Sequence, residues 1–167
     1  MKKTFLSLGI FLLLTFEVSA QSGAITTFIL VRHAEKGSDG TDDPDLKPEG
    51  MERAKRFAAL MKNTSIQGVY STKYKRTKNT VTPLAQEKGF EVQVYDVAKA
   101  DVIDGLLSKH AGGTVVIAGH SNTVPQIANL LTGKEEYKTF PDTDYGNILI
   151  VSVLERGKVA KVTWLNY

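Results

Sequence analysis

Two short apolar segments place the strongest limit on the fold of this chain. Thr27–Val31 and Thr114–Ala118 are apolar and partly β-branched, as buried strands are. Helical and strand patterns alternate along the rest of the chain, so we expect an α/β fold, a three-layer α/β/α sandwich around a mostly parallel sheet. Asn147–Leu154 and Lys158–Leu165 form a C-terminal hairpin, which should add antiparallel strands at one edge of that sheet.

Spacing, caps and turns predict the remaining elements. After Pro48, which suits the first turn of a helix, one apolar helix face is formed by Met51, Ala54, Phe57, Ala58 and Met61. Three more helices are predicted. The first is capped by Ser71 or Thr72 and runs to about Lys88, the second spans Ala100–His110, and the third runs from Asn122 or Thr123 to about Leu131. Two more strands are predicted, over Gly68–Tyr70 and Glu91–Tyr95. Pro83 is expected to bend the second helix or end its first half.

The first 20 residues have the layout of a secretory signal peptide. Lys2 and Lys3 precede an apolar run, Phe5–Phe16, and the small residues Val18-Ser19-Ala20 suit cleavage before Gln21. A membrane anchor is the alternative, but the apolar run is shorter than the roughly 20 residues that a spanning helix needs. We therefore expect an exported protein, periplasmic or secreted, with no stable membrane insertion after cleavage and one domain over residues 21–167.

Composition excludes several kinds of site. The net charge of +3 is spread along the chain, so nucleic acid is not an expected partner. The absence of cysteine excludes disulfides, thiolate metal sites and cysteine nucleophiles.

The first of the predicted buried strands ends in a basic pair, within Leu30-Val31-Arg32-His33-Ala34-Glu35. Open α/β sheets bind their ligands at the carboxyl ends of strands. The guanidinium of Arg32 offers a planar fork of donors to a phosphate, and a neutral His33 imidazole can attack phosphorus. The alternative is an ordinary strand end with two solvated polar side chains.

A second apolar strand also ends in a histidine, within Val115-Val116-Ile117-Ala118-Gly119-His120-Ser121-Asn122. If the two strands are parallel neighbours, the imidazoles of His33 and His120 face one crevice. The helix that follows exposes free N–H groups, which favour an anion. The alternative role for His120 is to cap that helix or to lie in the core.

A third basic group follows the predicted strand at Gly68–Tyr70. Lys73, Lys75 and Arg76 crowd the first turn of a helix, where cations oppose the helix dipole and a bound phosphate would offset that cost. We predict that Arg76 belongs to the site and that the two lysines form a solvated face.

Two other kinds of catalytic site fit the sequence poorly. Gly119-His120-Ser121 partly matches a serine-hydrolase elbow, but no histidine follows Ser121 to complete a triad in that chain order. The chain has three histidines, and His33, His110 and His120 lack close ligand spacing, so no metal site and no cofactor are predicted. His110 ends a helix, where surface capping is its expected role.

In the order and spacing of these motifs the chain resembles the histidine phosphatase superfamily, with its phosphoglycerate mutase-like fold. The resemblance spans nearly all of the chain after residue 20 and includes Asp45-Leu46-Lys47-Pro48-Glu49-Gly50 before the first helix. Ala34 stands where the family usually has glycine. The chain is most similar to short members without a cap domain, which implies a metal-independent phosphatase acting on a small phosphorylated compound, a monoester or a phosphoramidate.

The resemblance also implies roles for individual residues. His33 would attack the phosphoryl group in line and form a phosphohistidine, while Arg32, Arg76 and His120 would bind the phosphoryl oxygens. For the general acid, the sequence offers Asp101, Asp96 and Glu35, each of which could equally be a capping, loop or ion-paired carboxylate. A phosphate-ester-binding protein of the same fold, with little or no turnover, is the alternative function.

Overall fold

A computed structural model of the protein describes residues 23–99 and 101–167. Its helices and strands alternate as β1 (Thr26–Arg32), α1 (Pro48–Leu60), β2 (Gly68–Ser71), α2 (Lys75–Lys88), β3 (Val92–Val94), α3 (Val102–Lys109), β4 (Thr114–Gly119), α4 (Thr123–Thr132), β5 (Asn147–Glu155) and β6 (Val159–Asn166). The predicted leader, residues 1–20, lies outside the described residues. Among the helices that are described, none is long and apolar enough to cross a membrane.

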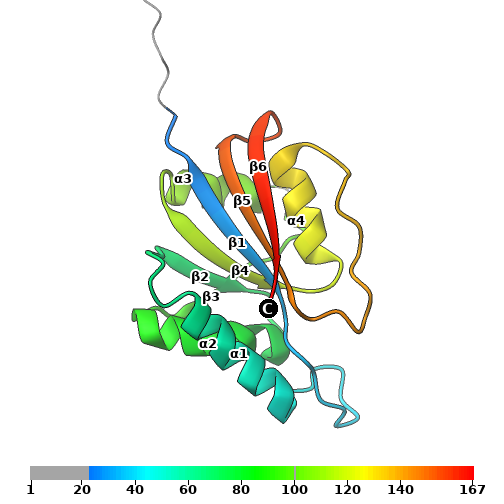
Figure 1. The fold of residues 1–167 in the computed structure, drawn as a ribbon. Helices are drawn as coiled ribbons and strands as arrows, with labels where there is room; N and C mark the ends of the chain where they lie inside the picture. The colour runs from blue at the N-terminus through cyan, green and yellow to red at the C-terminus, as the bar shows by residue number, and fades with distance from the viewer. Residues whose placement is uncertain (1–22, 100) are drawn as a thin grey trace, which may run out of the picture.

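The six strands form one sheet in the order β3-β2-β4-β1-β5-β6. The four strands from β3 to β1 are parallel, and β5 and β6 are antiparallel at one edge. Helices α1 and α2 cover one face of the sheet, and α3 and α4 cover the other (Figure 1). This arrangement confirms the predicted three-layer α/β sandwich and its C-terminal edge hairpin.

The central strand β1 is buried on both faces, which explains its continuous apolar sequence. Phe28 and Leu30 point to the cluster that contains residues of α3 and α4, whereas Ile29 and Val31 point to the cluster that contains residues of α1 and α2. β4 alternates in the same way beside β1. The two strands that lead into the histidines are therefore packed on both faces of the sheet.

Two local predictions were wrong, and one alternative of a third is excluded. Met51 is 51% exposed, although the other residues of its predicted apolar face are buried. Met51 lies at the edge of the buried face of α1. α2 begins at Lys75 rather than at a cap on Ser71 or Thr72, since Ser71 still belongs to β2. Of the two effects predicted for Pro83, ending the helix is excluded: Pro83 lies inside α2, where the burial of neighbouring Val81 and Leu84 offsets one lost hydrogen bond.

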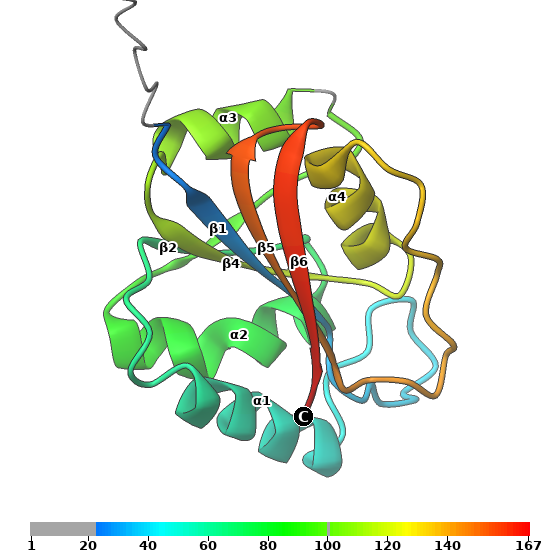
Figure 2. The ribbon, with the colours of Figure 1, turned by 45° about the horizontal axis from the view of Figure 1, so that its top comes forward.

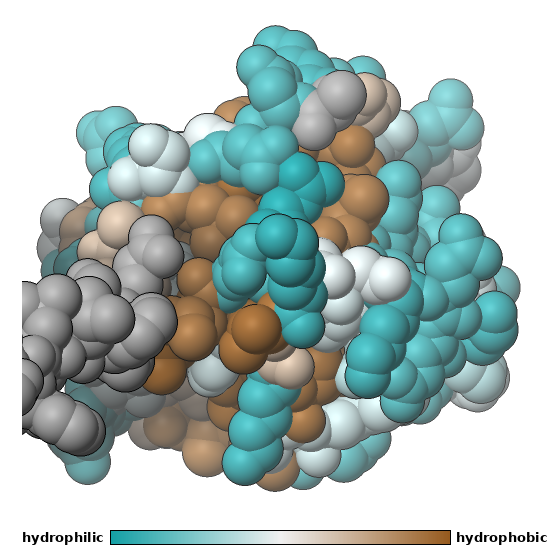
Figure 3. Space-filling model, turned by 90° about the horizontal axis from the view of Figure 1, so that it is seen from above, coloured by the Kyte–Doolittle hydropathy of each residue, from teal (hydrophilic) through white to brown (hydrophobic). Residues whose placement is uncertain are grey.

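The two ends of the sheet differ in character. At the end where β1 begins and β5 turns into β6, apolar side chains gather on the surface, and Ile25, Leu154 and Val159 are exposed there (Figure 3). At the opposite end, the loop that follows β1 and the loop that precedes β5 lie side by side (Figure 2). These two loops border the carboxyl ends of β1 and β4, where the sequence places its histidines.

Candidate active site

The fold brings the two strand-end histidines together. β1 and β4 are parallel neighbours with Arg32 opposite Gly119, and the N–H of His33 donates to the Gly119 carbonyl over 2.8 Å. The ring centroids of His33 and His120 are 5.3 Å apart. The prediction that both imidazoles face one crevice is therefore confirmed.

A pocket of about 490 Å³ surrounds this pair. Four of its residues, Arg32, His33, Arg76 and His120, were predicted from the sequence. The other residues that line it are Lys36, Tyr74, Ser121, Asn122, Asp142 and Tyr145. The lining carries three permanent cations against one carboxylate, so the pocket favours a multiply charged anion.

Hydrogen bonding fixes the tautomer of His33. Nδ1 lies 2.8 Å from the carbonyl oxygen of Ala34, which can only accept, so Nδ1 carries the proton and Nε2 keeps its lone pair. The N–H of Ala34 in turn donates to Thr80 Oγ1 at 2.8 Å, and that hydroxyl donates to the Arg76 carbonyl. These contacts hold the imidazole with a nucleophilic nitrogen on its free side.

The electrostatic surroundings keep His33 uncharged. Burial, followed by the positive charges of His120, Arg32 and Arg76, lowers the pKa of His33 to about 3, although the hydrogen bond to Ala34 acts in the opposite direction. A neutral imidazole is the form that can attack phosphorus. His33 is therefore ready to act as a nucleophile at neutral pH.

His120 is fixed by groups on two other elements. Its Nε2 lies 3.0 Å from the hydroxyl of Thr72, and its backbone N–H donates to Thr123 Oγ1 over 2.8 Å. Burial, and then the charges of Arg76 and Arg32, lowers its pKa to about 4. The second imidazole is thus also neutral at neutral pH and can donate a hydrogen bond from one ring nitrogen.

Arg32 is buried and is bound to the loop before β5. Its Nη1 donates to the carbonyls of Pro141 and Asp144, both at 2.7 Å, and its Nη2 donates to the carbonyl of Asp142 at 3.1 Å. The guanidinium also stacks on Tyr145, 4.3 Å from the ring centroid. Arg32 therefore lines the pocket and also positions the loop before β5, which forms the opposite wall of the pocket.

Arg76 is held more loosely on the opposite side. Its guanidinium stacks on Tyr74 at 4.4 Å from the ring centroid, and its Nη1 lies 3.5 Å from the Asp42 carbonyl and 3.7 Å from the Asp43 carboxylate. Among the described residues, the Nε atoms of Arg32 and Arg76 are buried and have no hydrogen-bond partner. Such unsatisfied donors are costly unless a ligand satisfies them, and here both belong to cations beside the nucleophile.

Comparison with known proteins relates part of this arrangement to one superfamily. Residues 28–97 match the model of the histidine phosphatase superfamily (branch 1). The match includes Arg32, His33 and Arg76 and ends before His120. A search of curated proteins found no match.

Solved structures of several phosphatases share the fold. The protein histidine phosphatase SixA, complexed with tungstate, is 17% identical, with 84% of this chain and 96% of that chain covered and a TM-score of 0.67. Mycobacterial glucosyl-3-phosphoglycerate phosphatase is 13% identical, with 85% and 99% covered and a TM-score of 0.67. Phosphoserine phosphatase from Entamoeba histolytica, in complex with 3-phosphoglyceric acid, is 18% identical, with 85% and 97% covered and a TM-score of 0.63.

The carboxylates that the sequence suggested as the general acid lie outside the pocket of His33. Glu35 is paired with Arg53, whose Nε lies 3.0 Å from both carboxylate oxygens and whose Nη2 lies 2.7 Å from one of them. That pairing lowers the pKa of Glu35. Asp96 accepts the N–H of Ala98 at 3.0 Å, and Asp101 is exposed at the start of α3.

Of these three carboxylates, Asp96 lines a pocket of about 410 Å³ that adjoins the pocket of His33 and shares Tyr74 and His120 with it. His110 lies far from this region, and its expected surface role was wrong. Its ring is buried, with Nε2 2.7 Å from the Tyr70 hydroxyl, so it completes the core beneath α3.

Six lining residues were not assigned to the site from the sequence: Lys36, Tyr74, Ser121, Asn122, Asp142 and Tyr145. Tyr74 follows a strand beside Arg76, so its position in a known motif could have indicated it. Asp142 and Tyr145 lie in an irregular segment whose path is set by hydrogen bonds to Arg32. No periodic pattern in the sequence encodes that path.

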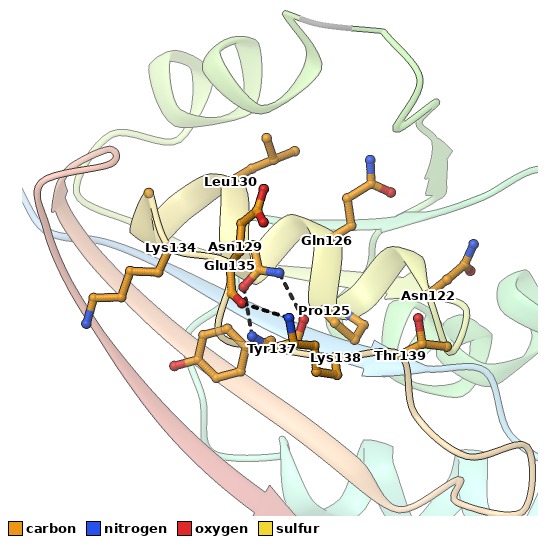
Figure 4. A pocket seen from close by; sticks show the side chains of 11 residues that line it. Asn122, Pro125, Gln126, Asn129, Leu130, Lys134, Glu135, Tyr137, Lys138 and Thr139 are labelled. Carbon is orange, nitrogen blue, oxygen red and sulfur yellow. Dashed lines mark hydrogen bonds between the residues drawn. The ribbon is translucent and has the colours of Figure 1, made fainter.

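A second groove continues from the pocket along α4. Its volume is about 500 Å³, and Asn122 lines both cavities. Figure 4 shows Asn129 on α4 bonded to the backbone of Tyr137, with its Nδ2 and Oδ1 both at 2.9 Å from their partners. The start of the loop before β5 is thereby fixed to the helix and forms the far side of the groove.

Proposed function

We propose that this protein is a histidine phosphatase that hydrolyses a small phosphorylated compound through a phosphohistidine intermediate on His33. One observation carries the proposal. The free Nε2 of a neutral His33 lies in the same pocket as two arginines whose buried Nε donors are unpartnered. A phosphoryl group bound there would accept hydrogen bonds from those donors and would lie beside the nucleophilic nitrogen.

In the first step, His33 Nε2 attacks phosphorus while the bond to the leaving group breaks on the opposite side. Negative charge on the equatorial oxygens is stabilised by Arg32, Arg76 and an N–H of His120. These groups are already positioned by the fold, so little reorganisation accompanies the reaction. The charge that a metal ion supplies in other phosphatases is supplied here by the two guanidinium groups, and we propose a metal-independent reaction.

In the second step, water attacks the phosphohistidine and releases inorganic phosphate, which regenerates neutral His33. The pocket of about 490 Å³ holds a phosphoryl group with room to spare. The two adjoining cavities, along α4 and below Tyr95, can receive the rest of the substrate. We infer a monoester or a phosphoramidate as substrate, since a single phosphoryl group can contact His33, both arginines and His120 at the same time.

A phosphate-ester-binding protein with little turnover is the alternative, because its pocket would need the same arginines. Turnover of para-nitrophenyl phosphate by the purified protein, with and without a chelator, separates the two functions. We expect metal-independent turnover that is abolished in His33→Ala and in His33→Gln. Phosphate binding without turnover on any phosphorylated compound would favour the binding protein, and activity retained in His33→Gln would exclude the mechanism.

We further propose that the protein is exported. The layout of residues 1–20 supports this proposal. Expression of the full chain in a bacterial host, followed by mass determination of the product in the envelope and medium fractions, tests it. We expect a chain that begins at Gln21, and an unprocessed chain confined to the cytoplasm would contradict export.

A further inference from the structure

We propose that Asp142 is the general acid that protonates the leaving group of this phosphatase. The inference rests on the proposed phosphatase function and deepens it by assigning the proton donor. The first support is location. Among residues 23–99 and 101–167, Asp142 is the one carboxylate that lines the pocket of His33 and His120. A proton donor must reach the leaving oxygen, so this position is the first requirement.

The second support is how Asp142 is held. Its backbone carbonyl accepts the Nη2 hydrogen bond of Arg32, and the carbonyls of Pro141 and Asp144 on either side accept two more from Nη1. The same arginine that lines the phosphoryl site thus fixes the segment that carries the acid. The distance between acid and phosphoryl site is set by a buried side chain of β1 rather than by a free loop.

The third support is that the carboxylate itself is uncommitted. Its side chain is 99% exposed, and its nearest cation, Arg32 Nη2, is 3.8 Å away, beyond hydrogen-bond distance. Glu35, in contrast, makes three short hydrogen bonds to Arg53, which keep it ionised. Asp142 can therefore turn toward a bound substrate without breaking a hydrogen bond, and gives up only the long ion pair with Arg32.

Solvent supplies the proton that Asp142 donates, because water reaches its 99% exposed side chain. In the first step this proton passes to the leaving atom, and in the second step the attacking water returns it.

The reaction balances as follows. His33 Nε2 forms a bond to phosphorus as the bond from phosphorus to the leaving oxygen or nitrogen breaks, and the Asp142 carboxyl proton passes to that leaving atom. The Asp142 carboxylate then accepts a proton from the attacking water as a phosphorus–oxygen bond forms and the His33–phosphorus bond breaks. Inorganic phosphate leaves, and both residues return to their starting states.

A series of substrates with different leaving groups tests this assignment. An acid matters little for a good leaving group such as para-nitrophenolate and greatly for an alkoxide. For Asp142→Asn we expect kcat/KM to be nearly unchanged with para-nitrophenyl phosphate and to fall with alkyl phosphates by roughly 10²- to 10⁴-fold. The deficit should grow steadily with the pKa of the leaving group.

Three comparisons make the result decisive. Glu136→Gln removes the same charge from the same loop outside the pocket, so its profile should follow the wild type. An equal loss for every substrate in Asp142→Asn, or no loss for any, would overturn the role of Asp142 while leaving the phosphatase function intact. A deficit that grows with leaving-group pKa in Asp96→Asn instead would move the role to Asp96. Wild-type protein without turnover on any phosphate would remove the proposed function and this inference together.

Discussion

Alanine in place of Arg32 should cost both folding stability and activity, whereas alanine in place of Arg76 should cost activity alone. Both guanidinium groups line the same pocket, but they are bound differently. Arg32 is 3% exposed and donates three hydrogen bonds to backbone carbonyls, two of them at 2.7 Å. Arg76 has contacts only at 3.5 and 3.7 Å besides its stacking on Tyr74.

The expected magnitudes follow from these contacts. A hydrogen bond to a charged group is worth roughly 1.5–3 kcal/mol, and its removal leaves a carbonyl unsatisfied. Water that enters the open loop and the relief of repulsion between cations recover part of that loss. We therefore expect Arg32→Ala to lower the free energy of unfolding by about 2–4 kcal/mol. Arg76→Ala should change it by less than about 1 kcal/mol, because contacts as long as 3.5 and 3.7 Å contribute little.

Urea unfolding followed through the fluorescence of Trp164, the one tryptophan of the chain, measures these differences. Turnover of para-nitrophenyl phosphate is measured without urea and at saturating substrate. It should fall in both variants by about 10²- to 10³-fold, as when one oxyanion donor is removed. The reasoning would be refuted if both variants were destabilised equally, or if Arg32→Ala were as stable as the wild type.

Three further predictions concern pH and packing. Because the pKa of His33 is about 3, kcat/KM corrected for substrate ionisation should stay level on the acid side until below about pH 4, and an inflection near pH 6.5 in the pH–rate profile would contradict a neutral, buried nucleophile. The lowered pKa of Glu35 beside Arg53 means that its contribution to stability is present at neutral pH and is lost as the pH falls through that lowered value. The stability gap between wild type and Glu35→Gln in urea titrations should therefore close in acid and be constant near neutrality. In the helices, Gly105→Ala on α3 has open space and should stabilise by roughly 0.5–1 kcal/mol, whereas Gly50→Ala on α1 would press a Cβ against the Glu35 backbone and should lower the melting temperature.

Much of the fold was predictable because periodic patterns encode it. The runs that became β1 and β4 are continuous and apolar, and their burial on both faces of the sheet requires that pattern. The pairing of His33 with His120 followed from the same logic, since parallel neighbours end at one edge. Pro83 shows where a local rule fails, because the packing of α2 outweighs a single helix-breaking residue.

The far wall of the site was not predictable from such patterns. Asp142 and Tyr145 reach the pocket because Arg32 binds three carbonyls of their loop and because Asn129 holds its start. The contacts of Arg32 join residues more than a hundred positions apart, and those of Asn129 join a side chain to a backbone. Composition and spacing predict neither kind of contact. The suggested acid Glu35 illustrates the same limit, since its partner Arg53 comes from α1, 18 positions further along the chain.

The central claim is the covalent intermediate on His33. Rapid mixing with para-nitrophenyl phosphate, an alkaline quench that preserves phosphohistidine, and peptide mapping by mass spectrometry test it directly. The account predicts one phosphoryl group per protein, attached to Nε2 of His33, that forms at least as fast as steady-state turnover. Turnover without a phosphoenzyme, or a phosphoryl group on His120 in place of His33, would contradict it.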